Sequence, residues 1–223
     1  VNTIDERVSL VKMPSNVGFA GAVNHGARQA SRGYLCLLNP DSHIDPEAIA
    51  YLTARLRTDS SIGAIAPLIE QGGSAAGNSG SYRFPTLWRT LLTFSGLSFL
   101  GGPRWLEGTV LLRKQITASR TVDWLTGACL VVPIEVWDEV GGLTERWFMY
   151  AEDLDFGMRI RRSGRKSVVD PAVSISHEVG TGSSTPAPAI EAAWLVNQWD
   201  FYRTEMARAS FQPAVWKATA SIF

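Results

Sequence analysis

The feature that most constrains the fold is an apolar run, YLCLLN at residues 34–39, bounded by Gly33 and Pro40. A short apolar segment between two turn residues is typical of a central strand in a parallel sheet, buried on both faces. A helix is predicted directly after it, within residues 44–59, because Asp45 suits the N-cap and Pro46 the first helical position. A buried strand followed by a capped helix indicates an α/β fold.

The same alternation extends along the first third of the chain. VSLV at residues 8–11 and GAIAP at 63–67 are predicted as further short strands, and residues 20–30 as a helix with many small side chains. Strands that alternate with helices pair in parallel through right-handed crossovers. We therefore predict a mostly parallel sheet that is flanked by helices.

The composition is that of a folded domain without a dominant charge. Of the 223 residues, 45% are hydrophobic and 19% charged, and Lys plus Arg equals Asp plus Glu at 21 each. Because the net charge is zero, no global field would hold nucleic acid, and we expect no nucleic-acid partner. We predict an α/β domain over residues 1–179, followed by a linker and an amphipathic helix over 180–223. The first residue is Val1 rather than Met, so we expect that the sequence lacks its natural start.

Three segments are predicted to lie outside the central sheet. GGSAAGNSGS at residues 72–81 favours a flexible loop. Residues 84–106 are rich in Trp, Leu and Phe but interrupted by Pro and Gly, which fits a lid, a membrane-surface patch or an irregular piece of core. Residues 190–209 are predicted to form an amphipathic helix rich in Trp and Tyr.

A carboxylate follows the predicted central strand, in the segment Asn39-Pro40-Asp41. Ligands of open α/β sheets bind beyond the carboxyl ends of the strands, where an Asp can supply an oxygen ligand to Mg²⁺ or Mn²⁺. The same residue types are favoured in plain turns, so this motif alone does not decide between the two. His177, at the end of another predicted strand, is a second candidate ligand, although a lone histidine is more often structural.

A Gly- and Asn-rich segment, residues 16–26, follows the first predicted strand. Glycine lets the backbone approach a phosphate or sugar closely, and asparagine can pair with a ribose or a base. An ordinary strand-to-helix turn would have the same composition, so the segment is a weak signal by itself.

Adjacent carboxylates, Glu152 and Asp153, stand at the predicted start of a helix, after the aromatic-rich segment WFMY at 147–150. Asp155 and Arg159 have the spacing of an i,i+4 ion pair, which explains that acid as structural. An ion pair does not explain four large side chains followed by two carboxylates. This pattern indicates a pocket wall with a general base at its rim.

Together, these segments resemble family 2 glycosyltransferases. The resemblance lies in NVGFAGAVNHG, YLCLLNPD, DWLTGACLVVP, VGGLTERWFMYAEDLDFGMRIRRSG and ISHEVGTGSS, which occur in the family's order and approximate spacing. Each piece is weak, but the set is specific, covers roughly residues 8–184 and is most similar to the rhamnosyltransferase-like branch that builds bacterial cell-surface polysaccharides. The resemblance implies a GT-A fold from which the family's first strand is missing.

The resemblance also implies roles for individual residues. Asp41 takes the place of the last carboxylate of the family's DxD motif, with Asn39 at the first position, which implies a metal held by one carboxylate and the donor diphosphate. His177 matches a histidine that ligates metal in some relatives, and Asp153, in the family's ED motif, would be the base. Asn16, Gly18 and Asn24 would lie on the donor side, and the donor–acceptor pocket would contain Thr126, Gly127, Ala128, Trp147, Tyr150 and Glu152.

The predicted function is a metal-dependent, inverting transfer of a sugar, with rhamnose as the nearest match. The donor would be a dTDP-, UDP- or GDP-sugar, the acceptor a glycan or lipid-linked hydroxyl, and the cofactor Mg²⁺ or Mn²⁺. We expect a cytoplasmic protein that makes peripheral contact with the inner face of the plasma membrane.

Two alternative functions stay open. A sugar-1-phosphate nucleotidyltransferase would need a Gly-rich loop with Arg or Lys after its first strand, and this sequence shows none. A degenerate domain that binds glycan or acts as a scaffold is favoured by Asn39 and by the missing start. The intact Asp41, Asp153 and His177 argue against it.

Overall fold

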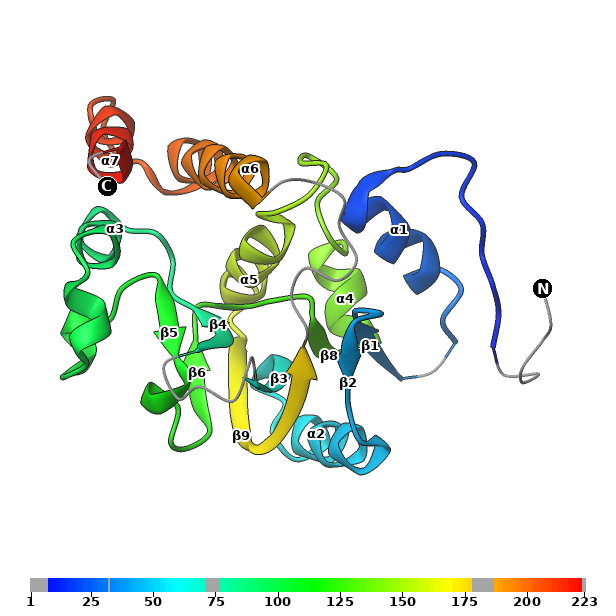
Figure 1. The fold of residues 1–223 in the computed structure, drawn as a ribbon. Coiled ribbons are helices and arrows are strands. Elements are labelled where there is room, and N and C mark those ends of the chain that lie inside the picture. Colours follow the sequence, from blue (N-terminus) through cyan, green and yellow to red (C-terminus); the bar gives the residue numbers. More distant parts are fainter. Residues whose placement is uncertain (1–7, 32, 71–76, 178–186, 222–223) are drawn as a thin grey trace.

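The computed structural model describes residues 8–31, 33–70, 77–177 and 187–221 (Figure 1). Its main sheet is built from β1 (Tyr34–Leu38), β2 (Ser42–His43), β3 (Ile62–Glu70), β6 (Arg120–Val122), β8 (Cys129–Pro133) and β9 (Lys166–His177). The strand order is β1-β8-β3-β9-β2, and β6 pairs with β9 beside this path. The predicted α/β fold with a central sheet is confirmed.

The main sheet is mixed rather than mostly parallel. β3 pairs in parallel with β9, whereas β8 pairs antiparallel with both β1 and β3. β1 and β3 therefore run in the same direction, as their helical connection requires, but β8 lies between them. The prediction of a mostly parallel sheet is wrong because this intervening strand comes from a distant part of the sequence.

Helices cover both faces of the main sheet (Figure 1). α2 (Pro46–Thr58) lies on one face, and α4 (Ile134–Val140) and α5 (Glu152–Arg162) lie on the other. The side chains of β8 alternate accordingly, since Val131 packs in the cluster under α2 and its neighbours Leu130 and Val132 pack under α4 and α5. The predicted N-cap of α2 is confirmed, because the Asp45 carboxylate accepts a hydrogen bond from the Glu47 N–H at 2.9 Å.

Residues 8–11 do not form the predicted strand. They are exposed, they pair with none of the described strands, and α1 (Gly18–Ala27) begins soon after them. β1 therefore lies at the edge of the described sheet, with Leu35 and Leu37 buried and Leu38 exposed. The predictions of a strand at 8–11 and of a central place for residues 34–39 are both wrong, because each depended on a pairing partner that the described chain does not supply.

A second, three-stranded sheet contains part of the predicted flexible loop. Its strands are β5 (Val110–Leu112), β4 (Asn78–Tyr82) and β7 (Trp124–Leu125), in that order. The prediction of a loop at 72–81 is wrong for β4, and residues 71–76 lie outside the described ranges. Buried serines fit this strand because their hydroxyls find partners, as when Ser79 Oγ donates to the Leu111 carbonyl at 2.7 Å.

The apolar segment at residues 84–106 is partly helical. It contains α3 (Leu87–Phe94) and two single 3₁₀ turns, Leu97–Leu100 and Arg104–Leu106. Thr86 begins α3 by accepting a hydrogen bond from the Arg89 N–H at 3.3 Å. None of the helices in the described part of the chain combines the length and the apolar composition needed to cross a membrane.

The C-terminal residues form two helices instead of the single predicted one. α6 (Ala187–Phe201) ends in a π-helical turn at Tyr202–Met206, and α7 (Gln212–Ser221) follows. The Gln212 side chain accepts the backbone N–H of Arg208 at 2.7 Å, which stabilises the bend between the helices. α7 packs against α3, where the buried Trp216 donates its indole N–H to the Pro85 carbonyl at 2.9 Å.

Candidate active site

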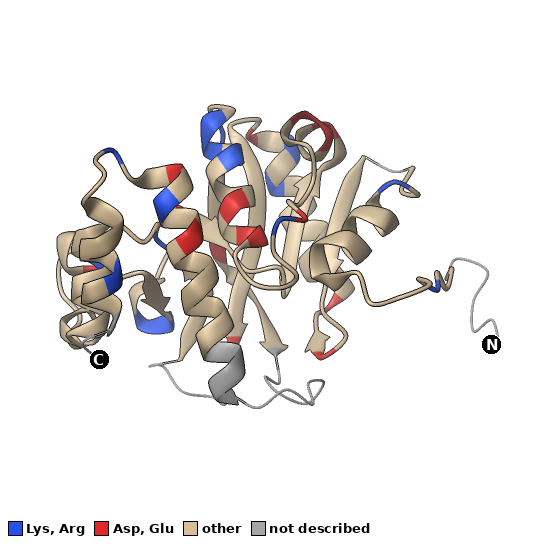
Figure 2. Cartoon of the chain, turned by 90° about the horizontal axis from the view of Figure 1, so that it is seen from above, with Lys and Arg blue, Asp and Glu red and all other residues tan. Residues whose placement is uncertain are grey.

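The candidate site forms around the first turn of α5. Tyr150 and Ala151, which directly precede the helix, have φ angles of 69° and 85° and are the only non-glycine residues with positive φ in the described ranges. This conformation is uncommon for residues with a Cβ and persists where the surroundings hold it. It leads into the first turn of α5, which contains Glu152 and Asp153 and where the helix dipole favours acidic side chains. Acidic residues lie toward the start of this helix and basic residues toward its end (Figure 2).

Side chains from α6 hold this strained segment. The Asn197 amide donates to the carbonyls of Met149 and Tyr150 at 2.8 and 3.1 Å. The indole N–H of Trp147 donates to the Asp200 carboxylate at 3.1 Å, and Trp147 is buried, so it supports the site from the interior. Sequence reasoning missed Asn197 and Asp200, because nothing in the pattern of the C-terminal helix indicates contact with a loop about 50 residues away.

The Asp153 carboxyl group lies in an environment that raises its pKa. It is half-buried, and its Oδ1 accepts the backbone N–H of Leu154 at 2.9 Å. Burial raises the pKa of Asp153 to about 6, against the opposing effect of hydrogen bonds from the backbone of Leu154 and Gly127. A carboxyl group with a pKa near neutrality can accept a proton in the physiological range.

The neighbouring Glu152 lies in the protein interior, with 5% of its surface exposed. Burial, and then the charge of Asp153, raises the pKa of Glu152 to about 8. Two adjacent carboxyl groups in a poorly solvated environment do not readily ionise together, so Glu152 is mostly protonated at neutral pH. Of the two predicted residues, Asp153 is therefore the one that carries the available negative charge.

Tyr82 and Asn78, in β4, belong to this site and were not predicted. The Tyr82 ring stacks on Trp124 with centroids 3.9 Å apart, and its hydroxyl accepts a hydrogen bond from the Asn78 amide at 2.7 Å. Burial, together with the charge of Asp153, raises the pKa of Tyr82 to about 12 despite the Asn78 hydrogen bond. A neutral phenol therefore lies within electrostatic reach of Asp153. No sequence signal marks these residues, since their Gly- and Ser-rich surroundings favour a loop.

The predicted donor-side and pocket segments converge near this carboxylate. Gly18 has a φ of +78°, and a Cβ at this position would lie 2.2 Å from the Phe148 carbonyl oxygen, so only glycine fits. A Cβ on Gly127 would similarly lie 2.9 Å from the Phe19 ring. The start of α1, the aromatic segment before α5 and the Thr126-Gly127-Ala128 segment thus meet in one place.

The two predicted asparagines of the donor side differ in their contacts. The Asn16 side-chain Oδ1 accepts the Gly18 N–H at 3.1 Å, which shapes the entry to α1. The Asn24 amide donates to the Leu143 carbonyl at 2.8 Å and to Glu145 at 2.9 Å, and its oxygen accepts the Leu143 N–H at 2.9 Å. These contacts occupy both N–H groups of Asn24 and join α1 to the segment between α4 and α5.

Thr126, Gly127 and Ala128 connect the two sheets beside Asp153. The Thr126 N–H donates to the Gly80 carbonyl in β4 at 3.0 Å, and the Ala128 carbonyl accepts the Asn39 N–H at 3.0 Å. A cavity of about 280 Å³ opens between α1 and β1, lined by residues that include Phe19, Leu35, Leu37, Asn39 and Gly127. The chain therefore has an open space that links the residue after β1 to the segment next to Asp153.

Asp41 lies in the turn between β1 and β2. β2 pairs antiparallel with the end of β9, so that Ser42 stands opposite residue 177 in the backbone register. This pairing brings the backbone of residue 177 beside the turn that carries Asp41. Within the described residues, no group of three or more His, Cys, Asp and Glu side chains lies close enough together to hold a metal ion.

Asp155 has the structural role that its spacing indicates. Its carboxylate accepts the Arg159 Nε–H at 2.7 Å, and the same guanidinium also donates to the Val140 carbonyl. The predicted i,i+4 ion pair is confirmed, and it ties α5 to the end of α4. Asp155 is thereby distinguished from Asp153, which forms no such pair among the described contacts.

The fold defines a class of protein. A solved mannosyltransferase from Pyrobaculum calidifontis has the same fold, with a TM-score of 0.57 and 17% identity, over 95% of this chain and 51% of that one. The α/β fold with its mixed sheet is thus the GT-A fold.

Sequence comparisons identify the family. The family model described as "Glycosyltransferase like family 2" matches residues 2–211. The chain is 30% identical over 185 residues to the N-acetylglucosaminyl-diphospho-decaprenol L-rhamnosyltransferase of Mycobacterium tuberculosis, covering 76% of this chain and 58% of that protein. It is 25% identical over 154 residues to the rhamnosyltransferase WbbL of Escherichia coli K12, covering 67% of this chain and 54% of that protein. The chain belongs to glycosyltransferase family 2, and it spans little more than half the length of these relatives.

Proposed function

We propose that this chain is the catalytic part of an inverting glycosyltransferase that transfers a sugar from a nucleoside diphosphate donor to a hydroxyl group. The observation that carries the proposal is Asp153, a half-buried carboxylate with a near-neutral pKa beside the Gly127 backbone. The rhamnosyltransferase names of the two sequence relatives support an L-rhamnosyl donor, and the name of the mycobacterial relative supports a lipid-linked diphospho-sugar acceptor.

In the proposed reaction, Asp153 accepts the proton of an acceptor hydroxyl. The hydroxyl oxygen then attacks the anomeric carbon of the donor, and the bond between that carbon and the diphosphate oxygen breaks. A single displacement of this kind inverts the anomeric configuration. Tyr82, whose raised pKa keeps it protonated, and the Gly127 N–H are donors that can orient the groups around the carboxylate.

A divalent metal ion on the donor side of the site is the second part of the proposal. The solved mannosyltransferase binds GDP-Man together with Mn²⁺. The proposal is supported by the pairing of β2 with β9, which sets Ser42, the residue after Asp41, opposite the backbone of residue 177. A carboxylate oxygen and an imidazole nitrogen are both suitable Mn²⁺ ligands. We propose that Asp41 and His177 hold the ion and that the donor diphosphate completes its coordination. The bound ion would neutralise charge on the leaving diphosphate.

Binding of a nucleoside diphosphate should depend on the metal. We expect UDP, GDP or dTDP to bind in millimolar Mn²⁺ and to bind about tenfold more weakly or worse in EDTA, because the chelator removes the ion that neutralises the diphosphate. A tenfold loss of affinity corresponds to ~1.4 kcal/mol of binding free energy. Isothermal titration calorimetry measures this directly. Asp41→Asn should remove the Mn²⁺ effect, whereas Asp45→Asn is a matched control because Asn caps α2 as well as Asp does. Equal affinity with and without metal would refute the metal part of the proposal.

The transfer rate should rise with pH through the pKa of the base. Asp153 accepts a proton only when it is ionised, and its pKa is raised to about 6. We therefore expect kcat/KM to fall about tenfold per pH unit below pH 6 and to reach a plateau above it. A pH series of initial rates at saturating Mn²⁺ checks this. A rate that stays constant down to pH 4.5 would mean that a carboxyl group with an ordinary pKa, and not Asp153, is the base.

A further inference from the structure

The segment at residues 87–106 exposes an unusual amount of apolar surface. Trp88 and Trp105 are 51% and 63% exposed, and Leu100 is 78% exposed. We call this surface the apolar patch; it consists of Trp88, Leu91, Leu97, Phe99, Leu100 and Trp105. The Trp88 indole N–H donates to the Trp105 carbonyl at 3.0 Å, so α3 and the second 3₁₀ turn present their side chains together. Exposed apolar side chains gathered in one segment indicate an interaction surface.

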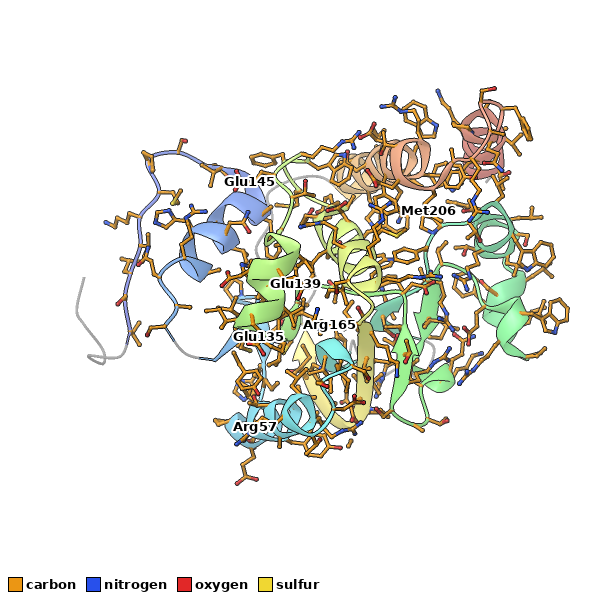
Figure 3. The ribbon with its side chains drawn as sticks, turned by 180° about the vertical axis from the view of Figure 1, so that it is seen from behind. Arg57, Glu135, Glu139, Glu145, Arg165 and Met206 are labelled. Atoms are coloured by element: carbon orange, nitrogen blue, oxygen red, sulfur yellow. The ribbon has the colours of Figure 1, made fainter. Side chains whose placement is uncertain are left out.

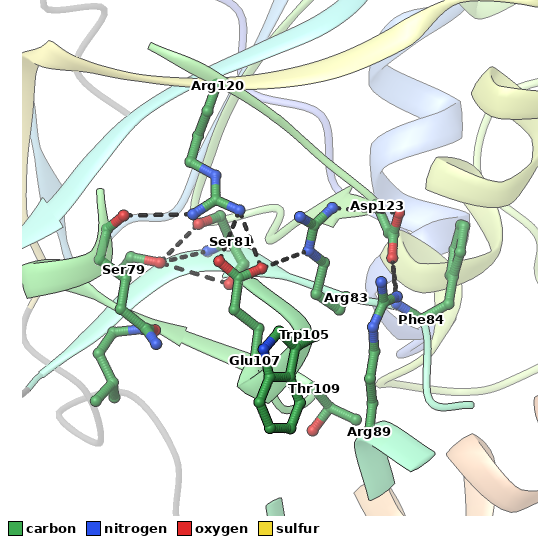
Figure 4. Close-up of polar contacts among 12 residues, drawn as sticks. Ser79, Ser81, Arg83, Phe84, Arg89, Trp105, Glu107, Thr109, Arg120 and Asp123 are labelled. Atoms are coloured by element: carbon green, nitrogen blue, oxygen red, sulfur yellow. Dashed lines mark hydrogen bonds and ion pairs between the residues drawn. The ribbon is translucent and has the colours of Figure 1, made fainter. Parts of the chain in front are cut away.

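The surroundings of the apolar patch are basic, although the chain as a whole is neutral. Residues 87–122 contain five basic residues and a single acidic residue, Glu107. Arg89 and Arg113 pair with Asp123 and Glu70 outside this segment, so the exposed positive charges beside the patch are those of Arg104 and Lys114. Glu107 is 5% exposed and pairs with Arg83 at 3.0 Å and with Arg120 at 2.9 Å (Figure 4). Because its charge is buried and neutralised, it does not offset the exposed positive charges of Arg104 and Lys114.

A pocket of about 500 Å³ adjoins the apolar patch. Its lining includes Leu100, Gly102, Arg104, Lys114 and Ser119, so the patch and the pocket share Leu100. The Lys114 ammonium donates to the Phe99 carbonyl at 3.1 Å, which ties the basic rim to the apolar loop. Arginine and lysine side chains at the mouth of a polar pocket suit an anionic phosphate group.

We propose that the apolar patch and this pocket dock onto the surface of an anionic phospholipid bilayer. Tryptophan and leucine side chains would enter the interfacial region, and Arg104 and Lys114 would contact lipid phosphates. Tryptophan is suited to this position because its indole has an apolar body and a polar N–H. A second copy of the chain is disfavoured as the occupant, since a symmetric contact would bring the basic rims of both copies together.

Vesicle flotation tests the docking surface without any donor or acceptor, so its outcome is independent of the proposed transfer. The unmodified chain should float with vesicles containing phosphatidylglycerol, and less so with pure phosphatidylcholine vesicles or at high salt. Arg104→Glu changes the charge by two units. Each charge near an anionic surface changes the partition coefficient about fivefold. We therefore expect the partition coefficient of this variant to fall about tenfold or more. The double variant Leu100→Ser/Trp105→Ser should show a fall of similar size, and it keeps the Trp105 backbone carbonyl that holds Trp88.

Two control variants separate the apolar patch from general surface effects. Arg57→Glu makes the same charge change on α2, away from the patch (Figure 3), and Val196→Ser removes an exposed apolar side chain from α6. Both should bind vesicles like the unmodified chain. The proposal is overturned if the chain does not float with anionic vesicles, or if the controls lose as much binding as the patch variants. It is also overturned if the patch variants change the oligomeric state in light scattering and leave flotation unchanged.

Discussion

Asp153→Asn is expected to lower the initial rate of sugar transfer by at least ~10²-fold, because general-base catalysis typically contributes ~10²–10⁴-fold. Asparagine keeps the size of the side chain and an oxygen that can accept the Leu154 N–H, but it cannot take up the acceptor proton. Donor affinity should stay nearly the same, since the proposed base contacts the acceptor. Initial rates and calorimetric donor affinity of the purified variant measure the two effects separately.

Asp155→Asn is the matched control two residues along the same helix. Asp155 pairs with Arg159, whose guanidinium keeps a second partner in the Val140 carbonyl, so we expect a loss of stability of about 1 kcal/mol or less and little change in rate. The assignment of the base is wrong if Asp153→Asn retains most of the activity, or if Asp155→Asn proves the more damaging change.

Glu107→Ala is expected to destabilise the fold by about 3 kcal/mol, because it leaves the poorly exposed Arg120 guanidinium without its carboxylate partner and Arg83 with only the more distant carboxylate of Asp123, at 3.7 Å. Arg83 and Arg120 expose 14% and 9% of their side chains, and both contact the Glu107 carboxylate. The loss should also loosen the segment that carries the apolar patch, since Glu107 directly follows the second 3₁₀ turn. Urea unfolding followed by fluorescence and circular dichroism gives the free energy of unfolding and checks for a two-state transition.

Glu70→Ala provides the comparison for an exposed ion pair. Glu70 is 47% exposed and contacts Arg113 at 3.1 Å, so its removal should cost less than about 1 kcal/mol. If Glu107→Ala and Glu70→Ala lower the free energy of unfolding by similar amounts, burial does not make the Glu107 ion pairs more important for stability, and the prediction is wrong.

Several elements could be predicted because their signals are local. The start of α2 depends on Asp45 and Pro46, which are adjacent in the sequence. The i,i+4 pair of Asp155 and Arg159 is likewise set by helical spacing alone. These interactions form between residues a few positions apart, so sequence spacing specifies them directly.

Strand pairing could not be predicted in the same way, because a strand needs a partner from elsewhere in the chain. Residues 8–11 have a strand-like apolar sequence but remain exposed and pair with no described strand. Residues 78–82 have a loop-like sequence and form β4, since β5 and β7 lie on either side of them. In both segments the presence or absence of a neighbouring strand decided the structure, and the strand or loop preference of the residues themselves did not.

By itself, the sequence determined the α/β class, the family and the identity of the candidate residues Asp41 and Asp153, because motifs in a fixed order are a property of the chain. Only the tertiary structure decided the environment of Asp153. Its pKa is raised by burial, opposed by hydrogen bonds from the backbone, including that of Gly127, and the strained turn before it is held by Asn197 from α6. Burial and hydrogen bonding depend on which distant segments pack around a side chain, and linear spacing carries no information about that packing.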